Sequence, residues 1–354
     1  MRWFALPIVI LAALTPACSS SGAVGVGTVT DVVPPPKVVP NSVVRIDPKT
    51  LKPVQVVPVG NDPDLVVDAG GYIWVTHHML SDQNGPADIY NGARTLTRVD
   101  PSTGKARQVG GGLSPCGLSA GPSGGVLVAN CFPRSSGQTP DIVRVDAKTL
   151  ELKSWPVPGG HGFFRGVGYG GGWVWTDGVD NNGSSVIRIN PHTGAERSIH
   201  VRYPPGAFAW DAGHGDLWIN NSGGPVGAYP ASFTRLDAKT GTSSVIGTAP
   251  SHPVFPAVAG DTVWAADWYG PQVVRVAITG SRMPQIIPLP TTNDSAGVWN
   301  VAAGAGYIWA TTPRDGTLWR INPHTYAVTR IAMPYLPTMV AANASGVWVT
   351  VRGE

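Results

Sequence analysis

The sequence of 354 residues contains few charged side chains. Only 13% of the residues are Asp, Glu, Lys or Arg, and Glu occurs at just three positions, 151, 196 and 354. The formal net charge is +3, and no segment gathers Lys and Arg into a cluster. A nucleic-acid partner would need a basic stripe to neutralise phosphates. We therefore expect no nucleic-acid binding.

Helical periodicity and common cofactor motifs are also missing. No segment repeats its apolar residues with the period of a long amphipathic helix. The chain has no H-x-x-x-H, C-x-x-C or P-loop pattern, so the sequence indicates no cofactor. Residues 117–121 match the nucleophile elbow G-x-S-x-G, which requires a strand that runs into a helix. Here the segment is expected to be a strand that enters a hairpin turn, so Ser119 is not predicted to be catalytic.

The N-terminus has the pattern of an export signal. Arg2 precedes an apolar run, residues 3–14, that is short for a membrane span. Residues 14–18 (Leu-Thr-Pro-Ala-Cys) resemble a bacterial lipobox, which implies that Cys18 carries lipid; ordinary cleavage and an uncleaved anchor are the alternatives. We expect an exported lipoprotein held at the membrane of the cell envelope.

Only three cysteines are present, at positions 18, 116 and 131. If Cys18 is lipidated, Cys116 and Cys131 remain. They lie on consecutive predicted strands at similar distances from the turn near residues 123–124, and such positions face each other in an antiparallel hairpin. An oxidising compartment would favour a disulfide between them. Two separate buried thiols are the alternative.

A short sequence motif, called here the Arg phrase, recurs seven times along the chain. An apolar strand that carries Arg leads into Asp or Asn, usually followed by Pro and Thr. The arginines of these copies are Arg45, Arg98, Arg144, Arg188, Arg235, Arg275 and Arg320. They recur at intervals of about 46 residues, the period of one four-stranded propeller blade. With 45 Gly and 34 Pro to supply turns, the chain is predicted to be an all-β, seven-bladed β-propeller.

A second signature precedes each Arg phrase and defines how the ring closes. A Gly-rich turn leads to a strand with Trp between apolar residues, as in residues 72–75, except that Leu127 takes the Trp position of the second repeat. The chain enters at an Arg strand (residues 43–47) and leaves at a Trp strand (residues 347–351). The last blade therefore takes two strands from each end of the chain, which removes a free sheet edge. We predict a signal peptide at 1–17, a flexible lipid-anchored linker at 18–41 and the propeller at 42–354.

The repeated Trp and Arg have a structural explanation, since the middle strands of a blade are covered on both faces. Trp supplies buried area there, and Arg can reach a carbonyl or an Asp at the blade edge.

Positions that break the sevenfold pattern need another cause. Two sets of such positions are expected at the mouth of the central channel. The first set, ten residues before each Trp, contains Asp64, Arg165, Phe208, Val254, Trp299 and Thr338, with Gly117 or its neighbour in the second blade. The second set, where the Trp strand ends, contains His77, Asn130, Asp177, Asn220, Asp267 and Thr311, and Trp268 follows it.

The blade phrase, Gly-x-apolar-Trp-Val-Thr followed by apolar-x-Arg-apolar-Asp-Pro-x-Thr-Gly, resembles the YVTN/YncE-like and streptogramin-lyase-like seven-bladed propellers of bacteria. The similarity covers residues 43–351. It implies the fold, and for the lyases a metal-assisted reaction that uses a His and Glu set. Glu151 and Glu196 are placed on outer strands or their turns, so the lyase residues do not carry over.

Two main hypotheses about function follow. The first is a non-catalytic, monomeric propeller that binds a small ligand, a glycan or an envelope protein at the channel mouth. Its predicted contacts are Asp64, His77, Arg165, Asp177, Phe208, Asp267, Trp268 and Trp299. The second is a lyase or hydrolase that uses a divalent metal held by His77, Asp177 or Asp267. The channel-mouth residues could also simply hold water, and the ring could serve as a spacer in an envelope complex.

Overall fold

The computed structural model describes residues 35–77, 95–109, 113–130, 141–157, 166–178, 184–221, 230–248, 252–280, 283–292, 296–344 and 346–353. Three residues of functional interest, Cys18, Cys131 and Arg165, lie outside these ranges. Lipidation of Cys18 and the division of residues 1–41 into signal and linker therefore stay predictions.

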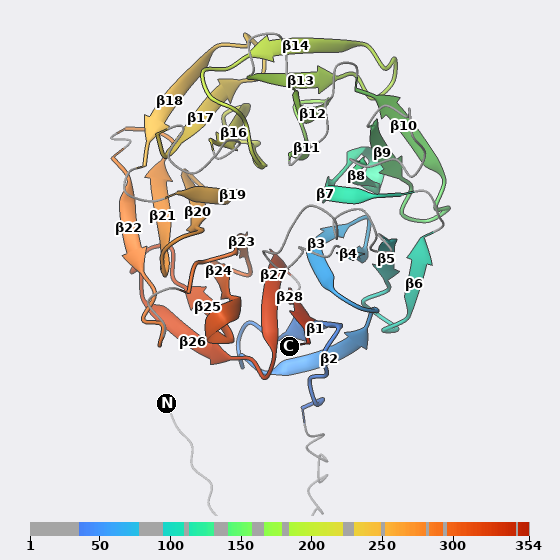
Figure 1. The fold of residues 1–354 in the computed structure, drawn as a ribbon, viewed down its shortest axis with the longest axis vertical. Coiled ribbons are helices and arrows are strands. Elements are labelled where there is room, and N and C mark those ends of the chain that lie inside the picture. Colours follow the sequence, from blue (N-terminus) through green and yellow to red (C-terminus); the bar gives the residue numbers. More distant parts are fainter. Residues whose placement is uncertain are drawn as a thin grey trace, which may run out of the picture. The chain divides into compact units, whose positions relative to one another are not determined.

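Seven antiparallel sheets of four strands each form a ring (Figure 1). Six sheets use consecutive strands, numbered here from the innermost strand outwards. Blade 1 contains β3 (Pro63–Ala69), β4 (Tyr72–His77), β5 (Thr95–Val99) and β6 (Ala106–Val109). Blade 2 contains β7 (Pro115–Ala120), β8 (Val126–Asn130), β9 (Asp141–Val145) and β10 (Leu152–Pro156). Blade 3 contains β11 (Val167–Gly170), β12 (Trp173–Gly178), β13 (Ser185–Ile189) and β14 (Glu196–His200).

The remaining blades complete the ring. Blade 4 contains β15 (Phe208–Asp211), β16 (Asp216–Asn220), β17 (Ser232–Asp237) and β18 (Ser243–Gly247). Blade 5 contains β19 (Pro253–Ala259), β20 (Thr262–Asp267), β21 (Gln272–Ala277) and β22 (Gln285–Pro288). Blade 6 contains β23 (Asn300–Gly304), β24 (Tyr307–Thr312), β25 (Thr317–Ile321) and β26 (Val328–Ala332). Blade 7 contains β27 (Leu336–Asn343), β28 (Gly346–Arg352), β1 (Ser42–Ile46) and β2 (Pro53–Pro58).

Blade 7 confirms the predicted closure of the ring. Its strand order is β27-β28-β1-β2, so β1 from the start of the propeller pairs with β28 from its end. Arg45 lies opposite Trp348 in this pair. The prediction of a seven-bladed, all-β ring is therefore confirmed.

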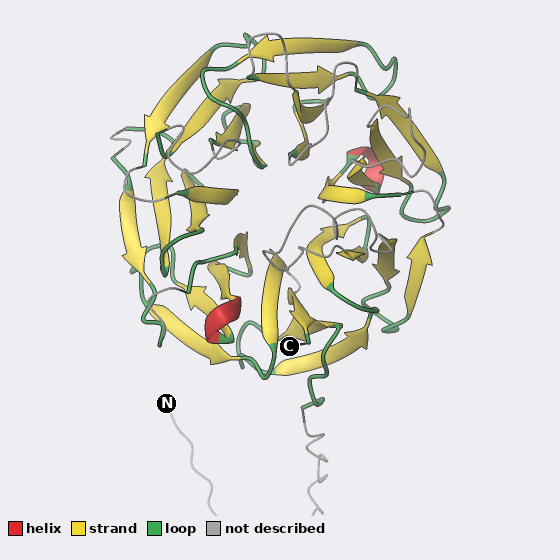
Figure 2. Ribbon diagram, viewed as in Figure 1, coloured by secondary structure: helices red, strands yellow, loops and turns green. Residues whose placement is uncertain are grey.

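Helix is almost absent from the described residues (Figure 2). The described part of the chain has two single turns of 3-10 helix, η2 (Pro122–Gly124) and η3 (Pro313–Asp315). Within the described ranges, no helix has the length and apolar character needed to cross a membrane.

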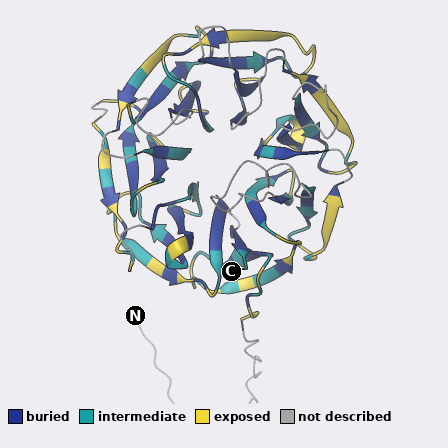
Figure 3. Cartoon of the chain, viewed as in Figure 1, coloured by how far each residue is buried: buried dark blue, intermediate teal, exposed yellow. Residues whose placement is uncertain are grey.

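The hydrophobic core is divided into layers, each between two neighbouring blades. Side chains of the middle strands are buried, whereas the outermost strands are largely exposed (Figure 3). Trp175 of β12, for example, packs with Leu217 and Ile219 of the next blade. The Trp residues of the repeated signature are all 0–2% exposed. This confirms that the repeated Trp is a packing residue.

The repeated Arg joins one blade to the next. The guanidinium of Arg98 donates to the carbonyl of Ala147 at 2.5 Å, and Arg188 donates to Ala238 at 3.0 Å. Both acceptors lie in the turn that follows the Arg strand of the neighbouring blade. Each guanidinium also lies over an aromatic ring. That of Arg98 is 4.2 Å from the centroid of the Tyr72 ring. The structural interpretation of the Arg phrase is therefore confirmed at these blades.

Candidate functional site at the central channel

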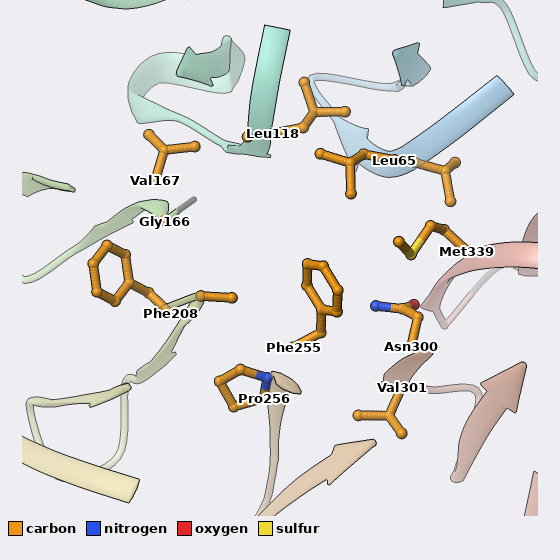
Figure 4. A pocket seen from close by; sticks show the side chains of 13 residues that line it. Leu65, Leu118, Gly166, Val167, Phe208, Phe255, Pro256, Asn300, Val301 and Met339 are labelled. Carbon is orange, nitrogen blue, oxygen red and sulfur yellow. The ribbon is translucent and has the colours of Figure 1, made fainter. Parts of the chain in front are cut away.

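The seven innermost strands surround a central cavity of about 120 Å³ (Figure 4). Every blade contributes to its wall, because β3, β7, β11, β15, β19, β23 and β27 each end their sheet on the inner side. The wall consists of Leu65, Val66, Gly117, Leu118, Gly166, Val167, Ala207, Phe208, Phe255, Pro256, Asn300, Val301 and Met339. None of these residues is charged.

Asn300 supplies the polar side chain of this wall. Its amide oxygen accepts the backbone N–H of Val340 in the neighbouring blade at 3.0 Å. That bond fixes the orientation of the amide, because only an oxygen can accept from an N–H. The Nδ2 group is directed into the cavity, toward the ring of Phe255 (Figure 4). The site therefore offers a hydrogen-bond donor of fixed direction.

The wall is uneven around the ring. Blades 2 and 3 present glycine backbone at Gly117 and Gly166, whereas blades 5 and 7 present the large side chains of Phe255 and Met339. Gly166 has no room for a side chain, since an added Cβ would lie 2.4 Å from the carbonyl oxygen of Gly206. The free space therefore lies between aromatic side chains on one side and backbone on the other.

Phe255 has an unusual backbone conformation. Its φ is +47°, in the left-handed region that non-glycine residues seldom adopt. The next residue is Pro256, and a residue before proline favours extended conformations. Phe255 lies in a β-bulge, where the register between β19 and β20 shifts between Val254 and Ala257. Strain of this kind is characteristic of sites where a side chain must take a particular direction, here toward the channel.

Asp64 and Trp299 lie beside the cavity wall. Each immediately precedes a lining residue, Leu65 or Asn300, at the entry of its inner strand. Two of the predicted contacts, Asp64 and Trp299, therefore lie next to residues of the wall. Arg165 is outside the described residues, so its part in the site stays a prediction.

Phe208 begins its inner strand, as predicted, but the lengths of the turns shift Phe208 and Gly117 along their strands relative to Asp64. In blade 1 a two-residue turn joins Ala69 to Tyr72, whereas in blade 4 four residues separate Asp211 from Asp216. Counting ten residues back from Trp218 therefore stops short of the level of Asp64. Phe208 lies opposite Ile219, the residue after the Trp, and the equivalent residue of blade 1 is Val66, two positions after Asp64. The longer turn of blade 2 shifts Gly117 in the same direction, to a position opposite Ala129. Both residues consequently line the cavity.

Asp64 is a buried carboxylic acid at the channel entry. Its side chain is 4% exposed, and burial raises its pKa to about 7, while the positive charge of Arg352 acts in the opposite direction. Arg352 itself pairs with Asp62 at 3.2 Å. The protonation state of Asp64 therefore changes near neutral pH.

The polar residues at the ends of the Trp strands are directed at the protein's own backbone. The ring of His77, 5% exposed, donates from Nδ1 to the carbonyl of Asn61 at 2.9 Å and accepts at Nε2 from the hydroxyl of Thr97 at 2.8 Å. Burial lowers its pKa, which favours this neutral ring. His77 thus fixes the loop that leads into β3.

Asp177 and Asp267 hold backbone in the same way. Asp177 accepts the N–H of Gly166 at 2.9 Å. Asp267 accepts the N–H groups of His252 at 3.3 Å and Tyr269 at 3.1 Å, and its second oxygen accepts from the side chain of Gln272 at 2.6 Å. Asp177 is 8% exposed and Asp267 is 2% exposed. None of these groups lines the cavity, and they lie in separate blades.

Trp268 and Trp299, predicted as aromatic contacts, are brought together by the structure. Their ring centroids are 5.4 Å apart and their planes differ by 21°, so the indoles of blades 5 and 6 are stacked. Both side chains are half-buried. Tyr269, which is 51% exposed, meets the ring of His252 edge-on at 4.9 Å beside them. We call Trp268, Trp299, Tyr269 and His252 the aromatic platform.

The sequence also suggested a possible metal site and a disulfide. Among the described residues, no group of three His, Cys, Asp or Glu side chains is arranged to hold a metal ion. Cys116 lies in β7, opposite the end of β8. Its predicted partner, Cys131, is outside the described residues, so the pairing of the two stays a prediction.

Phe255, Asn300 and Met339 were not predicted from the sequence. A partial signal exists, because Asn300 follows Trp299 and Phe255 follows Val254, both of which were selected at the channel entry. The pairing of β23 is regular, so Asn300 faces the channel without a bulge. In β19 and β27 a bulge places Phe255 and Met339, rather than the preceding residue, against the channel. A bulge of this kind leaves little trace in the sequence.

Comparison with solved structures supports the fold. The chain is similar to a chain of Kuenenia stuttgartiensis hydrazine synthase, with 14% identity, a TM-score of 0.60, and 80% of this chain and 90% of that chain covered. The WD40 repeats of RRP9 match with 10% identity and a TM-score of 0.61 over 88% of this chain and 98% of that chain. Apo AztD from Citrobacter koseri matches with 12% identity and a TM-score of 0.50 over 84% and 79%. No protein-family model and no curated protein sequence matches the chain. At these identities the similarity establishes the propeller fold alone.

Proposed function

We propose that this chain is an extracytoplasmic, non-catalytic binding protein that uses the channel-mouth face of its propeller. The observation that carries the proposal is the stacked pair of Trp268 and Trp299. Each indole is held in place by stacking on the other. The part of each half-buried ring that stays exposed offers apolar ring surface without the entropic cost of ordering it on binding. The ligand best suited to such a surface has a flat apolar face, as the rings of a glycan do.

The backbone around the pair is arranged to hold it rigid. The N–H of Trp299 donates to Thr311 at 2.9 Å, and that of Trp268 donates to His252 at 3.3 Å. Asp267 anchors the loop that carries Trp268 and Tyr269. Rigid aromatic anchors beside a polar rim are typical of binding surfaces.

Titration with a panel of soluble oligosaccharides, followed by intrinsic tryptophan fluorescence, tests the proposal. We expect at least one oligosaccharide to bind, and Trp268→Ala or Trp299→Ala to weaken its binding at least tenfold, on the order of one lost stacking interaction. Trp210→Phe is the matched control, because Trp210 lies at the opposite end of an inner strand, against Gly170. Equal oligosaccharide binding by the wild type and the three variants would show that the aromatic platform is not the binding site. If an envelope protein binds and no glycan does, the ligand is a protein.

The location of the protein is part of this proposal. The export signal and the Cys18 lipobox support a lipoprotein of the cell envelope. Labelling with palmitate in the native cell is expected to mark the wild-type chain and not a Cys18→Ser variant. Equal labelling of both, or of neither, would exclude lipid on Cys18.

A further inference from the structure

The geometry of the central cavity points to a second binding site, separate from the aromatic platform. We propose that it takes a small, uncharged, single-ring aromatic molecule that carries a carbonyl-type acceptor. The inference rests on the cavity's volume, its lack of charge, its two phenylalanines and the fixed donor of Asn300.

The volume limits the ligand to one ring. The cavity measures about 120 Å³. Apolar protein cavities of about 150 Å³ take up benzene. A fused-ring ligand would require the wall to move.

The wall offers no charged side chain that could pair with an ion. Its side chains are uncharged, and the buried acid nearby, Asp64, is not among them. Moving an ion from water into such a site without a counter-charge is strongly unfavourable. The occupant is therefore neutral.

The walls favour an aromatic ring. Phe208 and Phe255 belong to adjacent blades, and the thioether of Met339 lies on the same side as Phe255, across from Phe208 (Figure 4). Aromatic rings pack edge-on or offset against each other, and thioethers make favourable contacts with ring edges. The strained φ of Phe255 is explained if its ring direction is required for this contact.

A ligand that contacts Asn300 needs a hydrogen-bond acceptor. Because its oxygen is occupied by the N–H of Val340, the group that faces the cavity is the donor Nδ2. A carbonyl oxygen on the ring would accept from it. A hydrocarbon of the same shape would leave this donor without a ligand partner.

Three probes of similar shape test the site on the full-length protein. Dissociation constants for acetophenone, isopropylbenzene and benzoate can be measured by ligand-observed NMR. We expect acetophenone to bind about tenfold more tightly than isopropylbenzene, the value of roughly one hydrogen bond, and benzoate not to bind. No binding of acetophenone, or equal binding of benzoate, would overturn the proposal.

Two variants locate the probe. Asn300→Asp keeps an oxygen for Val340 and replaces the donor with a carboxylate oxygen, which repels a carbonyl, so acetophenone affinity should fall to that of isopropylbenzene or below it. Ala207→Phe fills the cavity and should abolish the binding of both acetophenone and isopropylbenzene. Circular dichroism checks that this variant folds. If it does not fold, Asn300→Asp alone decides whether acetophenone binds in the cavity. Trp268→Ala should leave acetophenone affinity unchanged. Loss of acetophenone binding in Trp268→Ala would place the probe on the platform and overturn the cavity site, whereas loss of oligosaccharide binding alone bears only on the platform.

Discussion

The guanidinium of Arg320 donates a hydrogen bond to the backbone carbonyl of Pro48 at 3.1 Å, although the two residues are 272 positions apart in the sequence. Arg320 belongs to blade 6, and Pro48 follows β1 in blade 7. The same guanidinium lies 4.5 Å from the centroid of the Tyr307 ring. A contact between the beginning and the end of the propeller is thus made by the residue that joins neighbouring blades elsewhere in the ring.

Removing this contact should weaken the closure of the ring. Arg320→Met keeps the aliphatic stem but loses the hydrogen bond and the cation–π contact, so we expect the free energy of unfolding to fall by about 1–2 kcal/mol. Urea denaturation measures the change. Arg197→Met, on the exposed strand β14, is the control and should alter stability by less than about 0.5 kcal/mol. Equal effects of the two substitutions would show that Arg320 does not stabilise the closure.

Asp64 should make the stability of the protein depend on pH. Its pKa is about 7 in the folded protein and near 3.8 when unfolded, so the folded state holds the proton more tightly between these values. Stability contributed by the protonated acid is therefore present at low pH and is lost as the pH rises through 7. Asp64→Asn stays neutral, and its stability relative to wild type should rise from pH 5 to pH 8.

Thermal unfolding of both proteins at several pH values measures that difference. Each unit by which the pKa is raised corresponds to ~1.4 kcal/mol. Asp237→Asn is a suitable control, because hydrogen bonds from the Thr240 and Lys239 backbone lower the pKa of Asp237, so its titration lies below this range. A stability difference between Asp64→Asn and wild type that is constant from pH 5 to pH 8 would contradict the prediction.

The strain at Phe255 can be measured with two substitutions. Phe255→Ala and Phe255→Gly both remove the ring, but only glycine adopts a φ of +47° without steric cost. We expect the glycine variant to be more stable than the alanine variant by about 1 kcal/mol, the reverse of the usual order in a strand. Chemical denaturation compares them.

Gly168→Ala provides a reference for the ordinary effect. Gly168 pairs with Trp175 on the inner strand β11, has no positive φ, and its added Cβ would meet Phe208 at an ordinary 3.5 Å. Alanine there should be tolerated. An alanine variant of Phe255 at least as stable as the glycine variant would mean that the backbone at Phe255 is unstrained.

The architecture could be predicted from the sequence because each blade repeats the same local sequence pattern. The Arg phrase and the Trp strand recur with nearly constant spacing, and the incomplete patterns at the two ends add up to one blade. That argument correctly joined β1 to β28. It depends on which elements are present and not on their fine register.

The candidate site depends on register, and there the sequence was insufficient. Turns of different length in blades 2 and 4 moved Gly117 and Phe208 along their strands. Bulges placed Phe255 and Met339 against the channel in preference to Val254 and Thr338. A polar residue such as His77 also gives no sign, in sequence, of whether it will bind a ligand or its own backbone.

The shared blade constrains the order in which the molecule can be completed. Strands β1 and β2 are synthesised before the other strands of the ring, yet the strand that β1 pairs with inside blade 7, β28, is synthesised last. Until then their inner edge has no partner in the sheet, and a growing chain cannot finish folding blade by blade from its start. A nascent protein that stops short of residue 346 would present an open strand edge to its surroundings, so protection of that edge during synthesis or export becomes a requirement of this topology.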